Sequence, residues 1–158
     1  MVYSFKGGPD GATPMAGLTY QDGIFYGTTD AGGGSTGCGA SPGCGTVFEF
    51  NPANRAEHVL YRFTGGSDGG QPQAPLIYQG GSLFGTATSG GADSVGGTVF
   101  SVDPTNKTET VLYSFGSNFE NGAVPVAGLI FDNGVFYGTT SLGGFSIPGF
   151  GTVFSLTP

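Results

Sequence analysis

Stretches rich in aromatic and β-branched residues alternate along the chain with clusters of Gly, Asn, Asp and Pro. This pattern predicts short β-strands joined by turns, because branched and aromatic side chains suit a pleated, half-buried surface. Good helix formers are scarce, so no long helix is expected. The pattern is clearest at 127–131, 135–140 and 151–156, where Asn133-Gly134 separates the first two stretches. An Asn-Gly pair suits a type I′ hairpin, which requires positive φ at both central positions.

The same strand-and-turn unit occurs three times. Three signatures mark it, and their equivalents lie 52 to 58 residues apart. The signatures are Tyr3-Ser4-Phe5, Tyr61-Arg62-Phe63 and Tyr113-Ser114-Phe115; Phe25-Tyr26-Gly27-Thr28, Leu83-Phe84-Gly85-Thr86 and Phe136-Tyr137-Gly138-Thr139; and Gly45-Thr46-Val47-Phe48, Gly97-Thr98-Val99-Phe100 and Gly151-Thr152-Val153-Phe154. Self-similarity at such a period indicates a repeat architecture, which outranks any local interpretation.

Each complete unit contains four predicted strands. In the fourth strand of the first unit, alternation places Val59, Tyr61 and Phe63 on one face and Leu60 on the other. Four antiparallel strands in a repeat of this length predict a β-propeller blade. A β-solenoid is the main alternative, but its coils are usually nearer ~20 residues and do not contain the hairpin.

The signatures also resemble a known family. The Tyr-x-Phe element, the apolar-Tyr/Phe-Gly-Thr strand, a double glycine and the final Gly-Thr-Val-Phe are similar to the GloVer tandem repeat over the whole chain. The double glycines are Gly32-Gly33, Gly90-Gly91 and Gly143-Gly144. The chain departs from the family pattern at Ala87-Thr88 and in a longer loop of the first unit. The resemblance implies propeller-like blades and an exported bacterial protein, often beside a cell-surface sorting or anchoring region. It implies no catalytic activity, because none defines the family.

We therefore predict an all-β chain with one repeat domain over residues 1–158, made of three four-stranded antiparallel propeller blades. With the strands of a blade labelled A to D, the chain reads D, ABCD, ABCD, ABC. The expected boundaries are a D strand at 2–5 and blades at about 14–63, 72–115 and 125–157. The last blade thus lacks its D strand, and the first D strand lacks a blade.

The unfilled sheet edge predicts self-assembly, since unpaired N–H and C=O groups recruit another strand. Three blades cannot close into a ring alone, because propellers have roughly four to eight. We expect the first strand of one subunit to complete the last blade of a neighbour, in a cyclic head-to-tail oligomer. The ring-closure residues are Val2, Tyr3, Ser4, Phe5, Thr152, Val153, Phe154, Ser155 and Leu156. Usual blade numbers favour a dimer of six blades, but we prefer a trimer of nine, because related repeats run in long arrays.

Charge excludes some partners and leaves the compartment open. The net charge is −7, from eleven acidic and four basic residues, so nucleic acid is not an expected partner. No apolar run reaches the ~18 residues of a membrane span. The sequence shows no signal peptide, but a chain that begins directly on a strand resembles an excised or engineered fragment. We expect the parent protein to be secreted or at the cell surface.

Cys38 and Cys44 are the two cysteines, with five residues between them that include Pro and Gly. We expect a local disulfide, which implies an oxidising compartment and contributes roughly 2–3 kcal/mol at most, mainly by ordering its loop. A zinc site needs about four ligands, and the single histidine, His58, lies elsewhere in the repeat. Neither a zinc site nor a Cys–His nucleophile is expected, and no cofactor is predicted.

Acidic and aromatic residues supply the remaining candidates. Asp10, Asp68 and Asn121 each precede a glycine in a loop between units, where they offer possible calcium ligands together with Glu120. We interpret them as turn residues, because no EF-hand spacing accompanies them. Most aromatic residues are expected to pack between blades. The alternative sugar-stacking residues are Tyr20, Tyr26, Tyr78 and Tyr137, and the candidates for subunit or ligand contact are Phe145 and Phe150.

These observations predict a non-catalytic structural or binding scaffold whose partner is itself. A carbohydrate-binding, lectin-like propeller is the alternative, with a glycan as partner. A propeller hydrolase or lyase is the third hypothesis. It is disfavoured because a catalytic site needs convergent ionisable groups, whereas this chain has one histidine and dispersed carboxylates.

Overall fold

The computed structural model describes residues 1–39, 43–93, 95–116, 119–144 and 149–158. Within these ranges the chain forms eleven β-strands and no helix, which confirms the all-β prediction. Accordingly, no helix in the described part of the chain is long and apolar enough to cross a membrane.

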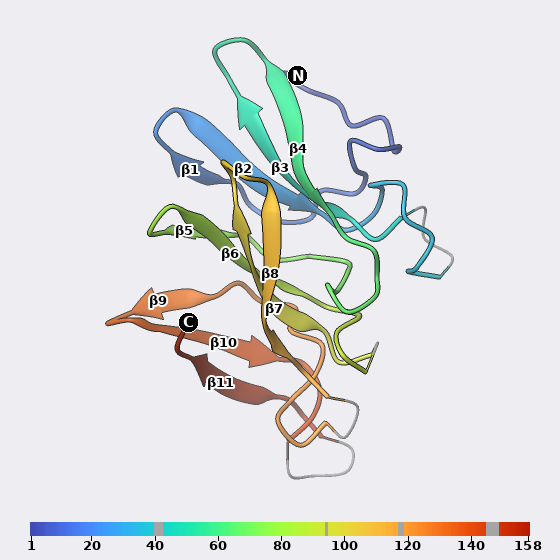
Figure 1. Cartoon of the computed structure of the whole chain (residues 1–158), viewed down its shortest axis with the longest axis vertical. Coiled ribbons are helices and arrows are strands. Elements are labelled where there is room, and N and C mark those ends of the chain that lie inside the picture. The colour runs from blue at the N-terminus through green and yellow to red at the C-terminus, as the bar shows by residue number, and fades with distance from the viewer. Residues whose placement is uncertain (40–42, 94, 117–118, 145–148) are drawn as a thin grey trace.

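The strands form three antiparallel sheets, and in each sheet the strands that pair with one another are consecutive in the chain. The first sheet contains β1 (Thr19–Gln21), β2 (Ile24–Thr29), β3 (Thr46–Asn51) and β4 (Ala56–Arg62). The second contains β5 (Ile77–Gln79), β6 (Ser82–Ala87), β7 (Thr98–Asp103) and β8 (Thr108–Ser114). The third contains β9 (Ile130–Asp132), β10 (Val135–Thr140) and β11 (Thr152–Leu156). Figure 1 shows the three sheets following one another down the molecule, with the N-terminus beside the first and the C-terminus beside the third.

Each sheet begins with a tight hairpin, as the sequence predicts. The two central residues of each turn have positive φ: 48° and 87° at Asp22 and Gly23, and 48° and 86° at Asn133 and Gly134. Gly80 and Gly81 repeat this conformation in the second sheet, at 59° and 92°. These are type I′ dihedrals, whose twist matches that of the flanking strands. The turn chemistry therefore sets the register of the first two strands in every sheet.

The core lies between neighbouring sheets. At the first boundary the rings of Phe63 and Phe100 meet edge to face, with centroids 5.0 Å apart and an interplanar angle of 66°. At the second boundary Phe115 and Phe154 repeat this contact at 5.2 Å and 70°. Such pairs contribute about 0.5–1.5 kcal/mol beyond their burial. The buried residues around the first pair are Tyr26, Cys44, Val47, Leu60, Leu76, Leu83, Ala87 and Val102.

The glycine of the Gly-Thr strand signature makes room for these rings. Gly27, Gly85 and Gly138 lie directly across from Phe48, Phe100 and Phe154 in the antiparallel ladder. A Cβ at Gly85 would lie 2.7 Å from the Phe100 ring and 2.7 Å from Leu76. The ring therefore lies over backbone, and the glycine is needed for space.

Alternation in the fourth strand is wrong for Leu60. The pairing of β3 with β4 shifts register between Val47 and Phe48. Val47 lies opposite Tyr61 and Phe48 lies opposite Val59, so Leu60 has no cross-strand partner. The shift is a β-bulge, which re-aims a side chain. Leu60 consequently joins the same buried cluster as Phe63 instead of the opposite face. β7 and β8 carry the equivalent shift between Val99 and Phe100.

Residues 2–5 do not form a strand within the single chain, so the described residues contain eleven strands where the sequence predicts twelve. The twelfth strand is predicted to pair with a neighbouring subunit, and it stays a prediction. A strand is held by hydrogen bonds to a neighbouring strand, and no strand of this chain pairs with these residues. The third sheet correspondingly has three strands, not four.

We predict that Gly85→Ala lowers the free energy of unfolding by about 1–3 kcal/mol, because the added methyl group must displace Phe100 or Leu76. Gly17→Ala is the matched control: nothing lies within 4 Å of its Cβ position, so the change should stay within about 0.5 kcal/mol. Chemical denaturation of both variants measures the difference. Equal stabilities would show that the glycine is not required by the ring.

Candidate functional site

The outer edge of β11 is the unfinished part of the fold. β3 and β7 each pair on both sides, whereas β11 pairs with β10 alone in the described chain. An edge of this kind presents unpaired N–H and C=O groups to any strand that can reach it. The third sheet therefore has a vacant fourth-strand position beside Thr152–Leu156, which we call the slot.

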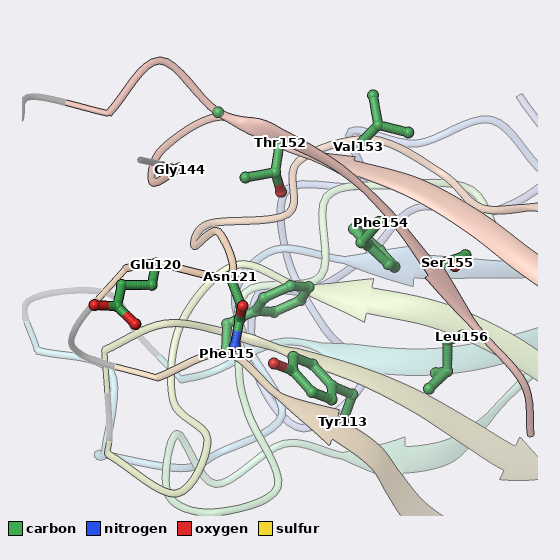
Figure 2. A pocket seen from close by; sticks show the side chains of 11 residues that line it. Tyr113, Phe115, Glu120, Asn121, Gly144, Thr152, Val153, Phe154, Ser155 and Leu156 are labelled. Atoms are coloured by element: carbon green, nitrogen blue, oxygen red, sulfur yellow. The ribbon is translucent and has the colours of Figure 1, made fainter. Parts of the chain in front are cut away.

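A pocket of about 640 Å³ lies in the slot. It is lined by Tyr113, Phe115, Glu120, Asn121, Gly144, Gly151, Thr152, Val153, Phe154, Ser155 and Leu156. Figure 2 shows Tyr113 and Phe115 facing β11, with Asn121 between Glu120 and the Tyr113 side chain. In the second sheet the corresponding space beside β7 is filled by β8.

The outer face of the third sheet is apolar and uncovered. Val153 is 80% exposed, while its equivalents Val47 and Val99 are fully buried. Tyr137 is likewise 42% exposed, against 8% for Tyr26. The second sheet covers these positions on the first sheet. The third sheet has an equivalent face, but no further sheet of the described chain packs on it.

The outer face of the first sheet is exposed in a complementary way. Leu18 is 55% exposed, whereas Leu76 and Leu129 at the same repeat position are 4% and 6% exposed. Leu76 is buried because it packs in the cluster between the first and second sheets. Leu18 lies on the side of its sheet where such a neighbour is missing. The two ends of the stack therefore expose the two halves of an internal contact.

Residues 2–5 pack on the first sheet as a fourth strand packs on the sheet that follows it. The Phe5 and Phe48 ring centroids lie 5.1 Å apart at 70°, which reproduces the Phe63–Phe100 contact. Tyr3 meets Phe5 edge to face at 5.2 Å, as Tyr61 meets Phe63. Val2, at 63%, remains largely exposed. The segment is thus neither loose in solvent nor folded onto its own third sheet.

A tyrosine and carboxylates meet where each fourth-strand segment crosses to the next sheet. The Tyr3 hydroxyl lies 2.9 Å from Asp10 Oδ2 and 3.2 Å from Glu57 Oε2. At the next boundary the Tyr61 hydroxyl donates to Asp68 Oδ2 at 3.0 Å. Glu109 stands at the position equivalent to Glu57, four residues before the next tyrosine. Because a hydroxyl donates one hydrogen, it cannot satisfy two carboxylates at once.

The close approach of these carboxyl groups, together with their burial, shifts their pKa values. Burial raises the pKa of Glu109 to about 7, and the neighbouring Asp68 carboxylate adds to the increase. Burial also raises the pKa of Glu57, despite the opposing hydrogen bond from Tyr3. Oε1 of both glutamates is buried and has no hydrogen-bond partner within the described ranges. Burial opposes ionisation of Asp10, but hydrogen bonds, from the Lys6 N–H and then the Tyr3 hydroxyl, lower its pKa overall.

Asp10 and Asp68 are thus placed as loop residues that hold a tyrosine. Asp68 also accepts from the Thr64 N–H at 2.7 Å, and Asp10 from the Lys6 N–H at 3.0 Å. The predicted calcium alternative gains no support: the described residues contain no group of three or more His, Cys, Asp or Glu side chains able to hold a metal. His58 is exposed on β4.

The predicted disulfide joins Cys38 and Cys44, whose Cα atoms lie 5.2 Å apart. One of the two cysteines also lies in the core. Cys44 is fully buried in the core between the first two sheets. Its carbonyl accepts the Gln71 N–H of the connecting loop at 2.7 Å.

The aromatic candidates divide between the core and the two ends. Tyr26 and Tyr78 stack at 6.0 Å and 22° across the boundary between the first two sheets. Their counterparts at the ends, Tyr137 and Tyr20, are 42% and 62% exposed. Phe150 is 87% exposed, next to β11. Phe145 lies outside the described residues.

The sequence analysis misses the pairing of Tyr3 and Tyr61 with carboxylates. A signal is present, because an aspartate follows each of these tyrosines by seven residues, at Asp10 and Asp68. The sequence alone indicates only that Asp10 and Asp68 are turn residues.

Comparison with protein families identifies the repeat. A family model described as the Gloeobacter/Verrucomicrobia repeat matches residues 1–158. A search of curated proteins finds no match to the chain.

We predict that the protein unfolds less readily at pH 5 than at pH 8. The raised pKa of Glu109 stabilises the fold fully below its unfolded value of about 4.5, and this stabilisation is lost as the pH rises through about 7. Glu109→Gln should raise the free energy of unfolding at pH 8 by about 1–2 kcal/mol, less than the full shift would give, because the side chain is partly exposed. Asp10 acts in the opposite sense, since the stabilisation from its lowered pKa is lost only as the pH falls below about 3.8.

Denaturation curves across pH 4–9 measure this effect. Glu49→Gln on β3 is the control, because it removes the same charge from a residue outside the contacts of Tyr3 and Tyr61 with the carboxylates described above. A profile that Glu109→Gln leaves unchanged would contradict the prediction.

Proposed function

The chain belongs to the Gloeobacter/Verrucomicrobia repeat family, and from its two exposed end faces we propose that it is a non-catalytic structural or binding scaffold that self-assembles into a closed ring. In this proposal the three sheets are blades of a β-propeller. The third sheet of one subunit packs against the first sheet of the next, head to tail.

One observation carries the proposal: each end exposes apolar residues whose repeat equivalents are buried between sheets. Val153 is 80% exposed against 0% for Val99, and Leu18 is 55% exposed against 4% for Leu76. Full burial of a valine or leucine side chain contributes about 1.5–3 kcal/mol. Stacking two chains end to end would bury both faces in a contact that the molecule already makes internally.

Strand addition would complete the same interface. Val2–Phe5 already packs on the first sheet through Phe5 and Phe48, as β4 packs on the second sheet. What the segment lacks is a partner for its backbone, and β11 of another subunit offers one. The proposed ring closure therefore pairs Val2, Tyr3, Ser4 and Phe5 with Thr152, Val153, Phe154, Ser155 and Leu156.

The internal boundaries also indicate particular hydrogen bonds across the closing interface. The Thr28 hydroxyl donates to the Ala74 carbonyl at 3.2 Å, and the Thr86 hydroxyl to the Ala127 carbonyl at 3.1 Å. Thr139 of the third sheet is the next residue in this series, and it is exposed. In a closed ring it would donate to the Ala16 carbonyl of the neighbouring subunit.

Backbone pairing between sheets extends in the same way. The Gln71 N–H donates to the Cys44 carbonyl at 2.7 Å, and the Val124 N–H to the Gly96 carbonyl at 2.8 Å. Thr13 and Phe150 hold the corresponding positions at the two ends. Closure would join the Thr13 N–H to the Phe150 carbonyl, which would give Phe150 a role in subunit contact.

The end tyrosines support assembly over sugar binding. Tyr137 and Tyr20 are the repeat equivalents of Tyr26 and Tyr78, which stack on each other between the first two sheets. In a closed ring the same stacking would occur between subunits. All four sugar-stacking candidates then have a packing role, so the lectin-like alternative has no aromatic residue of its own among them.

We prefer a trimer of nine blades over a dimer of six, because repeats of this kind run in long arrays. The disulfide between Cys38 and Cys44 favours an oxidising compartment, so we place the parent protein outside the cell or on its surface.

Val153→Lys tests the proposal. The side chain is 80% exposed within its own subunit, so the substitution should leave the fold intact. It places a charge in the proposed interface, and we expect the mass to fall from two or three chains to one. Light scattering coupled to size exclusion, with native mass spectrometry, gives the mass.

Thr110→Lys on the exposed side of β8 is the control and should leave the assembly unchanged. A native chain that sediments as a single subunit at all concentrations would contradict the ring, as would an assembly that Val153→Lys does not affect.

A further inference from the structure

We propose that the slot beside β11 recognises a carboxylate, and that its preferred occupant is a repeat strand with an acidic residue four positions before its tyrosine. This inference rests on the proposed function, since it adds a carboxylate site to the sheet edge where that function has one subunit add a strand to another.

The filled slots show what the position holds. In the first sheet Glu57 lies opposite Phe50 on β3, and its carboxylate reaches the Tyr3 hydroxyl at 3.2 Å. In the second sheet Glu109 lies opposite Val102 on β7 and interacts with Asp68. Both fourth strands thus deliver a carboxylate to the tyrosine and acidic loop residue that precede their sheet.

The slot contains the matching residues. Leu156 occupies the position of Phe50 and Val102, and Tyr113 that of Tyr3 and Tyr61. Both line the pocket, together with Asn121. Figure 2 shows Asn121 and Tyr113 on the side of the pocket that faces β11.

The third copy has an amide side chain where the other two copies have a carboxylate. Asn121 replaces the aspartate found at positions 10 and 68. An amide provides N–H donors where Asp10 and Asp68 provide negative charge. A carboxylate in the slot could therefore stay ionised and accept hydrogen bonds from Tyr113 and Asn121. Such charge-assisted bonds are roughly twice as strong as those between neutral groups.

One acidic group opposes this arrangement. Glu120 also lines the pocket, but in Figure 2 its carboxylate lies on the far side of Asn121 from Tyr113. Glu120 is exposed, so solvent and salt screen its repulsion.

Val2–Phe5 of a second copy would fill the part of the slot that follows the carboxylate position. Tyr3 and Phe5 would take the positions that Tyr113 and Phe115 take in β8 and the residues after it. The position of Glu109 falls two residues ahead of Met1. A chain extended there by Glu-Thr, the pair found at Glu109-Thr110, would bring the carboxylate to Tyr113 and Asn121.

The experiment compares three full-length chains: the native chain, one preceded by Glu-Thr and one preceded by Gln-Thr. Subunit dissociation is followed by native mass spectrometry and sedimentation over a dilution series at pH 8. We expect the Glu extension to lower the dissociation constant of each subunit contact about tenfold relative to the Gln extension, as a hydrogen bond to a charged group would.

Asn121→Asp in the Glu-extended chain is the second variant. It restores the facing carboxylates of the internal boundaries, so the tenfold gain should be lost at pH 8 and recover at pH 5, where one of the two carboxyls is protonated. The same substitution in the Gln-extended chain should change dissociation little.

The outcomes separate the two proposals. Native and extended chains that assemble with equal stability whether Glu or Gln leads would overturn the carboxylate site and leave the ring intact. Chains that remain single subunits in all three forms would overturn both the ring and the site.

Discussion

The contact between two phenylalanines across each sheet boundary determines much of this structure. One ring follows the fourth strand of a sheet and the other lies on the third strand of the next sheet: Phe63 with Phe100 and Phe115 with Phe154, at 5.0 and 5.2 Å. Phe5, in the segment ahead of the first sheet, makes the same contact with Phe48 at 5.1 Å. The ring on the third strand lies over a glycine in the second strand, which leaves no room for a side chain there. Because the two rings belong to different repeats, each sheet is stabilised mainly by the next one.

This dependence makes the ends of the stack different from its middle. In a linear repeat protein the stability is close to a sum over units and their boundaries, and terminal units usually have polar outer faces that cap the array. Here the outer faces carry Val153, Tyr137, Leu18 and Tyr20, which are all apolar or aromatic and 42–80% exposed. An array that ended in this way would be prone to aggregation. The proposed ring would remove this problem, because its two uncapped faces would cover each other.

The sequence predicts the parts of the fold that are encoded locally. The type I′ turns follow from Asp22-Gly23 and Asn133-Gly134, since few residue pairs tolerate positive φ twice in succession, and the disulfide follows from two cysteines in a short loop. The bulge at Leu60 could not be predicted, because alternation alone does not reveal a register shift between two paired strands.

The boundary clusters are harder to read from the sequence because their members come from distant segments. Tyr3 contacts Asp10, seven residues away, and Glu57, 54 residues away. The repeat indicates that these positions are equivalent between copies, but it does not show which of them meet. The same limit applies to the slot. The phase of the repeat predicts that the third sheet lacks its fourth strand, but only the structure shows that Tyr113 and Asn121 line the slot.

The difference between Asn121 and the two aspartates has a physical rationale in how the boundaries form. Asp68 and Glu109 belong to one chain, so the loops between sheets hold them at a high effective concentration, and the fold tolerates a raised carboxyl pKa there. In the proposed assembly, a strand that entered the third sheet from another subunit would have no such link and would lose translational and rotational freedom on binding. Repulsion between two carboxylates in the slot would subtract directly from the free energy of assembly. In the proposed ring, a neutral amide at position 121 would remove that repulsion at the boundary between subunits, where chain connectivity cannot compensate for it.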